Sequence, residues 1–439
     1  MAISARRTRA RVSGGASCLA LLGLAAGALG AGASAASPAP SVARSVAALD
    51  GHRAVPAPGD SSSLGAVSCA APASCWAVGG YTRGPTDFNQ VQRWNGRRWT
   101  LVPAPGRGNN EGDAGTALND VTCVTPASCW AVGELGRRDG SEHNQALHWN
   151  GRRWSPVSVP DPSAGGTDPY AFSYLSAVSC AAPASCWAVG SSERGDSAPQ
   201  LNQVLHWNGR RWSPVSVPQP GGRTALGLSE LFGVSCPVPA SCWAVGSSER
   251  GDSAPRLNQV LHWNGRRWSL VSVRTPSRFS ELIGVSCPAP RSCWAVGAYL
   301  IIGDGSFNQL TALNLALHWN GRRWSRVATP DQDGTSQGSG NQLIGVGCTA
   351  PADCWAVGSS GNVFGRVAGI ELNQALHWNG RKWSLVAVPD PGGATGFVAA
   401  NVLIGVGCAS AASCWAVGNL GPNGGNEALR WNGRRWSAG

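Results

Sequence analysis

The chain has 439 residues and a formal net charge of +11, yet only 13% of its residues are charged, while 59 are Gly, 29 Pro and 21 Trp. So many tryptophans exclude a disordered chain, and the length excludes a small scaffold held by disulfides alone. Because Gly and Pro break helix interiors, the composition indicates a folded, turn-rich, all-β protein.

Residues 1–35 have the pattern of a secretory signal peptide. Four arginines lie between residues 6 and 11, an apolar stretch runs from Cys18 to about Ala31, and Ala33-Ser34-Ala35 fits a cleavage site. The stretch is short and interrupted by Gly, which argues against a permanent membrane span. The pair Arg6-Arg7 leaves twin-arginine export open as an alternative. We expect a secreted or cell-wall-associated protein, with residues 36–49 as a short linker.

Removal of this segment leaves 31 basic and 24 acidic residues, since it holds four of the 35 basic residues and none of the acidic ones. It also leaves 14 of the 15 cysteines. An even number of cysteines in an exported chain indicates disulfide bonds.

A repeated unit organises the chain after residue 60. It reads V-S-C-x-x-P-x-S-C-W-A-V-G, then a variable stretch, then L-N-Q-x-L-H-W-N-G-R-R-W-S-x-V-x-V-P-x-P, and it occurs seven times. Each unit has two cysteines and three tryptophans, which accounts for all 14 cysteines after the signal segment and all 21 tryptophans.

Each unit contains four short strand patterns. In the second unit they cover Leu118–Thr122, Cys129–Gly133, Ala146–Trp149 and Arg153–Val159. The Asn-Gly pair before the last strand predicts a type I′ hairpin turn. Four antiparallel strands repeated seven times predict a seven-bladed β-propeller over residues 50–439. A parallel β-helix and two packed sandwiches are the alternatives.

The two ends of the repeat region complement each other. The last unit stops at Trp436-Ser437 and lacks the V-x-V-P-x-P stretch, whereas the segment from Asp50 to Pro58 resembles that missing stretch. We therefore expect the N-terminal segment to supply the outer strand of the last blade and to close the ring, which leaves no unpaired strand edge.

The V-S-x7-W-A-V-G segment resembles the repeat of propellers related to the photosystem II assembly factor Ycf48, within the wider sialidase-like, BNR-repeat group. The resemblance covers all seven units and implies a propeller fold. In place of that family's D-G-G-x-T-W turn, this chain has Asn95-Gly96-Arg97-Arg98-Trp99 and six copies, one residue shorter and without Asp. The regular cysteine pair also departs from the family.

The cysteine pairs span the first hairpin of each unit, where facing residues of antiparallel strands can form disulfides. Each bridge would contribute roughly 2 kcal/mol in the chain-entropy model. A zinc site needs clustered ligands, and a redox site would favour C-x-x-C, so both are disfavoured. The expected pairs are Cys69–Cys75, Cys123–Cys129, Cys180–Cys186, Cys236–Cys242, Cys287–Cys293, Cys348–Cys354 and Cys408–Cys414.

The tryptophans recur at the same place in every unit, so we expect them to pack between blades, although sugar stacking is the alternative. Histidines of the H-W pair are expected at a solvated edge and not in a metal site, because they lie on separate blades. They are His148, His206, His262, His318 and His377, with Arg93 and Arg430 in the end units.

The N-G-R-R turns predict a ring of basic residues on one face. This basic face comprises Arg97, Arg98, Arg152, Arg153, Arg210, Arg211, Arg266, Arg267, Arg322, Arg323, Arg381, Lys382, Arg434 and Arg435. The remaining 17 basic residues are outnumbered by the 24 acidic ones, which we place largely on the opposite face. This polarity would steer a polyanion, or serve solubility alone.

Binding residues are expected in the loops that differ between units. Two loops depart from the repeat and supply the candidate ligand-binding residues Asp168, Tyr170, Tyr174, Tyr299 and Asp304. They would suit a glycan or a peptide, with local packing as the alternative. A sialidase-like enzyme would need an arginine cluster and a Tyr with a Glu partner, and the repeat shows neither. Paired carboxylates for glycoside hydrolysis remain open.

We therefore expect a secreted, non-catalytic β-propeller, without catalytic residues, metal or cofactor. Its partner would be an extracellular protein or a cell-wall or surface glycan, bound through variable loops, and not nucleic acid. We expect a monomer without a transmembrane span. A lectin-like propeller is the first alternative, and a glycosidase or lyase of the sialidase-like group the second.

Overall fold

The computed structural model describes residues 55–106, 113–163, 168, 171–195, 198–251, 254–303, 310–361, 371–393, 400–421 and 424–439. The expected signal peptide and linker lie outside these residues. The described chain is all-β, with 28 strands in seven antiparallel units of four strands, which we call sheets; single parallel residue pairs join two pairs of these units. No helix in these ranges is long and apolar enough to span a membrane.

Each sheet is formed by four consecutive strands. The first strands are β1 (Ser61–Ala71), β5 (Asp113–Thr125), β9 (Phe172–Ala182), β13 (Leu228–Val238), β17 (Phe279–Ala289), β21 (Gly340–Ala350) and β25 (Asn401–Ser410). The second strands are β2 (Ser74–Arg83), β6 (Ser128–Arg137), β10 (Ser185–Glu193), β14 (Ser241–Glu249), β18 (Ser292–Ile302), β22 (Asp353–Gly361) and β26 (Ser413–Leu420).

The third strands are β3 (Thr86–Trp94), β7 (Glu142–Trp149), β11 (Leu201–Trp207), β15 (Leu257–Trp263), β19 (Leu310–Trp319), β23 (Leu372–Trp378) and β27 (Gly425–Trp431). The short fourth strands are β4 (Trp99–Leu101), β8 (Trp154–Pro156), β12 (Trp212–Pro214), β16 (Trp268–Leu270), β20 (Trp324–Arg326), β24 (Trp383–Leu385) and β28 (Trp436–Ala438).

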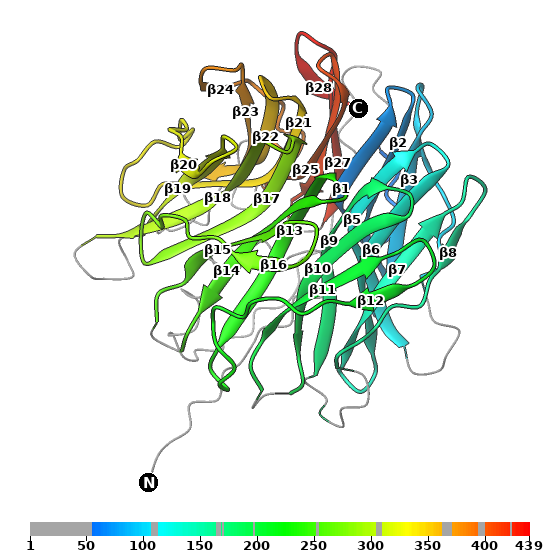
Figure 1. Cartoon of the computed structure of the whole chain (residues 1–439). Helices are drawn as coiled ribbons and strands as arrows, with labels where there is room; N and C mark the ends of the chain where they lie inside the picture. Colours follow the sequence, from blue (N-terminus) through cyan, green and yellow to red (C-terminus); the bar gives the residue numbers. More distant parts are fainter. Residues whose placement is uncertain are drawn as a thin grey trace, which may run out of the picture.

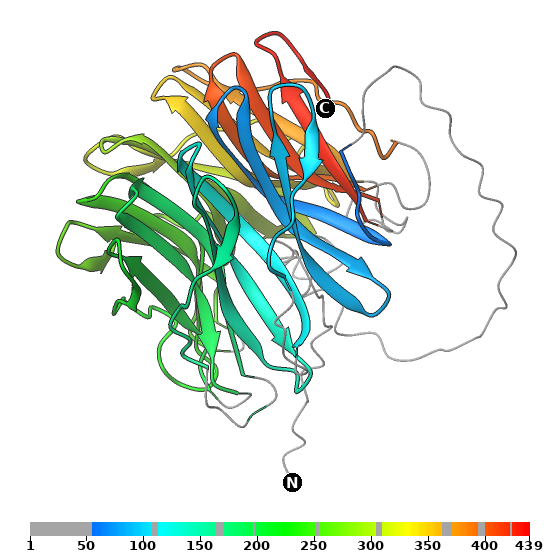
Figure 2. The same ribbon diagram turned by 90° about the vertical axis from the view of Figure 1, so that its right-hand side faces the viewer.

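The seven sheets stand side by side in a ring (Figures 1 and 2). Each first strand contacts the first strand of the next sheet, and β25 contacts β1, so the first strands surround the axis. Single parallel residue pairs, Glu142 with Phe172 and Ala312 with Gly340, link neighbouring sheets. The expected seven-bladed propeller is confirmed.

Two faces of the ring differ in their connections. We call turn face the edge that carries the tight turns between first and second strands and between third and fourth strands. The loop face is the opposite edge, with the loops between second and third strands and the connections between sheets. The two turns of one sheet touch, since Trp94 Nε1 donates to Pro72 O at 3.2 Å.

Tryptophan packing joins the sheets, as the repeat predicts. The Trp after the second cysteine packs against both hairpin tryptophans of the next sheet: Trp76 lies 4.7 Å from Trp149 and 5.3 Å from Trp154 between ring centroids. The same three-ring contact occurs at every sheet boundary. Edge-to-face aromatic pairs stabilise such contacts beyond their buried area.

All seven expected disulfides are present, each within the first hairpin of a sheet. The serine before the first cysteine links sheets, because Ser68 Oγ accepts the backbone N–H of Cys123 at 3.0 Å. Ser179, Ser235 and Ser286 make the equivalent bond to the next sheet. The V-S-C motif therefore stabilises the boundary between blades as well as the hairpin. The disulfides indicate an oxidising compartment.

The N-G-R-R turns do not have the expected type I′ form. Asn95 N–H donates to Arg98 O, so Gly96 and Arg97 are the central residues, and Asn95 precedes them. Gly96 has a φ of 91°, the left-handed value that glycine tolerates at the first central position. Asn95 Oδ1 instead accepts the backbone N–H groups of Arg97 and Arg98. The Asn side chain therefore holds the turn through these two hydrogen bonds.

The ring closes where the chain ends meet. Trp415 of the last sheet packs against Trp94 and Trp99 of the first, with the geometry of the six internal boundaries. The outer strand of the last sheet is the C-terminal β28, so the expectation that the N-terminal segment forms that strand is wrong in this detail. Instead Val55 packs into the same core cluster, and Pro56 O accepts a hydrogen bond from Asn426 Nδ2.

This contact copies one inside the other sheets. Asn144 Nδ2 donates to Pro160 O, and Asn202 Nδ2 donates to Pro218 O, at 2.7 and 2.8 Å. Val55-Pro56 thus occupies the place of Val159-Pro160 in the second sheet, and the N-terminal segment completes the last blade beyond β28. The same bond explains the Asn of the L-N-Q motif in six of the seven sheets, where it holds the connection that leaves the sheet. In the fourth sheet Asn258 makes no such bond.

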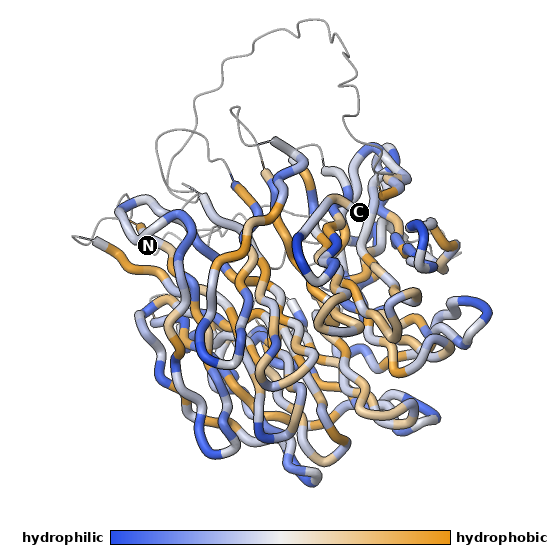
Figure 3. The backbone as a smooth tube through the Cα atoms, turned by 90° about the horizontal axis from the view of Figure 1, so that it is seen from above, coloured by the Kyte–Doolittle hydropathy of each residue, from blue (hydrophilic) through white to orange (hydrophobic). Residues whose placement is uncertain are grey.

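Strand lengths differ from the expected ones in a consistent direction. In the second sheet β5, β6 and β7 extend several residues further toward the loop face, whereas β8 is only Trp154–Pro156. The first three strands pair along their length, while the fourth strand has three residues in every sheet, whether it ends at Pro156, Leu101 or Arg326. The tube in Figure 3 is hydrophobic within the strands and hydrophilic at the hairpin tips.

Candidate functional site

Departures from the repeat gather at the loop face of the second to fifth sheets. In the third strand, His143 stands where Leu201, Leu257, Leu313 and Leu372 stand in other sheets. In the first strands, Tyr174, Glu230 and Glu281 share one position in three consecutive sheets, six residues before the first cysteine. Arg256 replaces Gln200 in the equivalent loop. These side chains form two polar groups.

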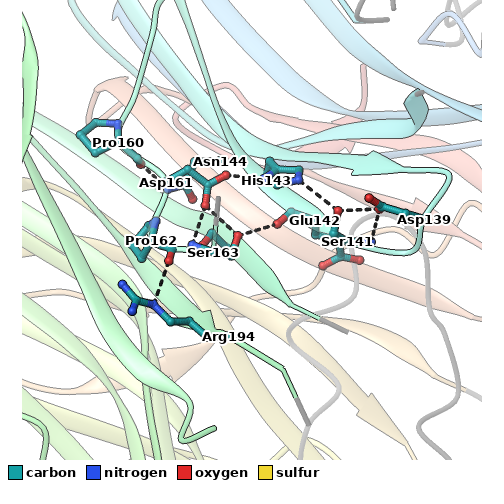
Figure 4. A network of polar contacts seen from close by, with 11 residues as sticks. Asp139, Ser141, Glu142, His143, Asn144, Pro160, Asp161, Pro162, Ser163 and Arg194 are labelled. Atoms are coloured by element: carbon teal, nitrogen blue, oxygen red, sulfur yellow. Dashed lines mark hydrogen bonds and ion pairs between the residues drawn. The ribbon is translucent and has the colours of Figure 1, made fainter. Parts of the chain in front are cut away.

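The first group surrounds His143 at the start of β7 (Figure 4). His143 Nδ1 lies 2.5 Å from Asp161 Oδ2, and His143 Nε2 lies 3.0 Å from Ser141 Oγ. Ser141 Oγ donates to Asp139 Oδ1 at 2.6 Å. Asp161 also accepts from the hydroxyl of Ser163 at 2.7 Å. The group ties the β6–β7 loop to the connection that follows β8.

Hydrogen bonds keep both carboxylates of this group ionised. Those from the Ser141 hydroxyl and N–H hold the pKa of Asp139 below its usual value. Burial raises the pKa of Asp161, but the hydrogen bonds from Ser163, His143 and Ser173 outweigh it and leave that pKa lowered. Because Ser141 has one hydroxyl hydrogen and gives it to Asp139, it accepts from His143. A serine nucleophile would need the opposite direction of that bond.

Asp161 has a different partner from its counterparts. In the fifth and sixth sheets, Asp331 and Asp390 accept the backbone N–H of Asn314 and Asn373, each at 2.8 Å. Asp161 occupies the same place and is directed to His143 instead. One histidine therefore converts a repeated structural carboxylate into part of a local polar group.

The second group lies between the third, fourth and fifth sheets. Arg256 Nη2 lies 3.4 Å from Glu230 Oε2, and Arg256 Nε lies 3.4 Å from Glu281 Oε2. The Tyr174 hydroxyl donates to Glu230. Arg256 Nε also donates to Ser247 Oγ at 3.0 Å, the bond that Gln200 makes to Ser191 in the third sheet. We call these four residues, Tyr174, Glu230, Arg256 and Glu281, the Arg256 group.

Burial sets the electrostatics of the Arg256 group. Glu281 is 1% exposed and Arg256 is 5% exposed. Burial raises the pKa of Glu281 to about 7, although the Arg256 charge lowers it. Burial and the Glu230 charge raise the pKa of the Tyr174 hydroxyl well above its usual value. One buried guanidinium thus serves two carboxyls, of which one holds its proton near neutral pH.

Further carboxyls with raised pKa values lie within the ring. Burial raises the pKa of Glu134 and of Glu427 to about 8, and that of Asp120 to about 7. Asn119 and Asn373 donate to Glu134 and Glu427, each at 2.5 Å. Such groups are candidate functional residues or structural ones. Among the residues described, no cluster of three or more His, Cys, Asp or Glu side chains could hold a metal ion.

Tyr174 and Tyr299, two described candidate ligand-binding residues, lie on different sheets. Tyr174 is on β9, and Tyr299 is on β18, two sheets away. Tyr299 is 7% exposed, with Arg326 Nη2 donating to its hydroxyl at 2.6 Å, so its ring does not offer a sugar-stacking surface. Asp168 O accepts the N–H of Ala171. Tyr170 and Asp304 lie outside the described residues.

Each of the repeated histidines stacks on a tryptophan and remains partly exposed. His148, His206, His262, His318 and His377 have their ring centroids 4.2 to 4.6 Å from the Trp that follows the second cysteine. Burial lowers the pKa of the first four. Arg93 and Arg430 hold the same place, each 5.4 Å from a Trp ring.

All fourteen residues of the basic face are exposed at the tips of the third-to-fourth-strand turns. Sequence reasoning did not single out His143, Arg256, Glu230 or Glu281. The sequence contains a signal for His143 and Arg256. His143 occupies the position that is Leu in the L-N-Q motif. The stretches 191–202 and 247–258 are identical except for Gln200 and Arg256.

Fold and site together define a disulfide-braced, seven-bladed β-propeller with a uniform turn face and a divergent loop face. No protein-family model and no curated protein sequence matches the chain. Among solved structures it resembles YCF48 bound to a D1 peptide, with 13% identity over 88% of this chain and 99% of that chain and a TM-score of 0.46.

A polysaccharide lyase of the ulvan lyase family PL25 has 10% identity over 86% of this chain and 95% of that chain, with a TM-score of 0.51. Chaetomium thermophilum Sqt1, bound to the N-terminus of ribosomal protein L10, has 10% identity over 88% of each chain and a TM-score of 0.44. At these identities the likeness extends to the fold alone.

Proposed function

We propose that this protein is an exported, non-catalytic propeller that binds an extracellular protein or surface glycan on its loop face, at the second to fifth sheets. The observation that carries the proposal is that these sheets hold His143, Tyr174, Glu230, Arg256 and Glu281, in two polar groups, at positions whose counterparts in other sheets include Leu201, Ala117, Val402 and Gln200. The first, sixth and seventh sheets form without these residues. Binding residues in repeat proteins concentrate where units differ.

The Arg256 group supports binding more than catalysis. Its guanidinium contacts both Glu230 and Glu281, so it is already paired and is not free to hold a substrate carboxylate. The hydroxyl of Ser141 is likewise committed to Asp139. The group fixes the relative position of three sheets, which gives a rigid surface above it. Rigidity reduces the entropy lost on binding.

The test is a binding panel with the mature, oxidised protein. Cell-wall polysaccharides, a glycan panel and surface-protein extracts are presented at low and high salt. Saturable binding that resists salt and is competed by a free sugar would identify a glycan ligand. The variant Arg256→Gln, which copies the third sheet, is compared with Arg266→Gln, an equal charge change on the turn face of the same sheet. We expect a loss of about tenfold for the first and none for the second.

Thermal unfolding of both variants verifies that they fold. If Arg256→Gln and Arg266→Gln bind the ligand found in the panel with equal affinity, the assignment of binding to the Arg256 group is overturned. Tyr174→Phe removes one hydroxyl without changing the charge and tests the same surface independently.

A glycosidase or lyase is the second candidate, favoured by one contact. Tyr174 donates to Glu230 beside Arg256, which is the Tyr and Glu pairing that a sialidase-like enzyme would need. Glu281, with a pKa of about 7, could donate a proton at neutral pH. Turnover of chromogenic glycosides or uronate polymers that Tyr174→Phe abolishes would establish this candidate and exclude the non-catalytic proposal.

A further inference from the structure

The basic face presents fourteen cationic side chains in a ring around the rim of the turn face. They lie in the turns between third and fourth strands, which are the outer strands of every sheet. The Asn of each turn accepts the backbone N–H groups of both basic residues, so each pair projects from the same rigid turn, as at Arg97 and Arg98. The fold repeats this pair seven times around one axis.

These cations have no carboxylate partners within the described structure, where no ion pair involves any of them. Among the described acidic residues, only Asp353 is the first residue of a strand that starts at the turn face. Its Oδ1 lies 2.7 Å from His377 Nε2, so its carboxylate is paired with that histidine and not with a residue of the basic face. Arg291, in another turn of this face, adds a further cation. The charge of the turn face is therefore available to an external anion.

We propose that the turn face binds a linear, flexible polyanion of the cell exterior. This inference is independent of the loop-face function. Each exposed ion pair contributes little, but seven linked pairs act together on one chain, so affinity arises from their number. A flexible chain can follow the rim and meet many turns, whereas a rigid duplex touches only one side of a ring. Arginine pairs with phosphate or carboxylate in bidentate fashion, so either group can supply the charge.

The test compares two variants that lose the same charge. The rim variant replaces the second basic residue of each turn by Gln, at Arg98, Arg153, Arg211, Arg267, Arg323, Lys382 and Arg435. The control replaces seven exposed arginines of the loop face by Gln, at Arg83, Arg137, Arg138, Arg194, Arg223, Arg250 and Arg278. The probes are inorganic polyphosphate and polygalacturonate, with duplex DNA of equal charge as the rigid reference.

We expect the wild-type protein to bind at least one flexible probe, with affinity that falls steeply as salt rises because bound counterions are released. The rim variant should lose about a hundredfold in affinity at low salt, with a shallower salt dependence, and the control less than about threefold. Binding of polyphosphate alone would identify phosphate as the charged group, and binding of polygalacturonate alone would identify carboxylate.

Equal loss in both variants would show that net charge alone is responsible and would overturn the proposal. No binding of either probe by the wild type, or tighter binding of duplex DNA, would also overturn it. The rim residues are exposed, so the rim variant should fold. In the control, Arg83, Arg194 and Arg250 also donate to the carbonyls of Pro58, Pro162 and Pro220, so its folding is checked in the same way. Near-ultraviolet circular dichroism of the tryptophans verifies this. If the rim variant fails to fold, the salt dependence of the wild-type protein and four-site rim and control variants decide the question.

Discussion

The turn face and the loop face are built by the same seven units, yet they differ in what the units keep. At the turn face every sheet has the same cysteine pair, the same three tryptophans and the same basic turn. At the loop face the units differ in loop length and in charged residues, and there His143 and Arg256 find partners in single copies. Packing demands identical residues at each boundary, whereas recognition needs only one copy of a side chain.

This division has a physical origin in the ring. A three-tryptophan contact must fit at all seven boundaries, because one poor fit would leave an open edge between blades. Toward the loop face, the contacts between neighbouring sheets include polar side chains, such as Arg256 with Glu281, which tolerate exchange of partners. Asp161 is an example: it contacts the side chain of His143, whereas its counterparts Asp331 and Asp390 accept a backbone N–H, and the third strand of its sheet still forms.

The largest effect that we expect is a loss of stability on truncating one of the tryptophans near the turn face. Trp243→Ala removes a ring that is 1% exposed and packs against Trp319 and Trp324. We expect a destabilisation of about 3–5 kcal/mol, since truncation of a buried aromatic leaves a cavity. Thermal unfolding measures the fall in the transition midpoint.

The control for this variant is Tyr81→Ala, which truncates a partly exposed ring stacked on Phe88 near the loop face. It should cost only about 1 kcal/mol. Equal destabilisation by the two variants would contradict the division between a packed turn half and a permissive loop half.

The effect that we expect to be intermediate in size is a change of the free energy of unfolding with pH, caused by Glu427. Glu427 stands where other sheets have Gln145, Gln203, Gln259 and Gln374, and its folded pKa is about 8 against an ordinary value of 4.5. Because the folded state holds this proton more tightly than the unfolded state, the free energy of unfolding falls as pH rises from about 4.5 to about 8.

Glu427→Gln keeps the oxygen that accepts from Asn373 and removes the titration. We expect it to stabilise the protein by about 2–4 kcal/mol at pH 8, from the shift between the two states, and to have little effect below about pH 5. Thermal unfolding between these pH values measures this. A variant with the wild-type pH dependence would show that Glu427 is not the responsible carboxyl.

Much of the fold could be predicted from the sequence because it recurs. Cys69 and Cys75, or Trp76 and its hairpin partners, have the same spacing in seven copies, and repetition reveals which contacts are structural. The Arg256 group could not be predicted this way. Glu230 and Glu281 lie on different sheets, and their approach to Arg256 depends on how the sheets pack.

The form of the N-G-R-R turns and the surroundings of the H-W histidines also depend on packing. The Asn-Gly pair suits a type I′ turn, but Trp94 and Trp99 pair across the strands and shift Asn95 out of the central position. The histidines of the H-W motif look solvent-facing in the strand pattern. A Trp on the neighbouring strand stacks on each of them, and each side chain stays partly exposed. Both outcomes arise from tryptophan packing between strands, which local sequence does not encode.

The smallest effect that we expect is the change in stability on replacing His143 at the loop face. It tests whether this histidine is needed for folding. His143→Leu copies Leu201, Leu257, Leu313 and Leu372, so the sheet should accept it with a change in stability within about 1 kcal/mol. Released from His143, Asp161 should turn to the backbone N–H of Asn144, as Asp331 and Asp390 do for Asn314 and Asn373.

Amide hydrogen exchange at Asn144 detects that change as increased protection, with Asn202 in the unaltered third sheet as the internal reference. Unchanged exchange at Asn144 together with a large loss of stability would contradict this view, because His143 would then be a structural requirement of its blade. Because four other blades fold with Leu at this position and two fold with Phe88 or Gly425, an unperturbed variant would leave recognition as the reason for a histidine there.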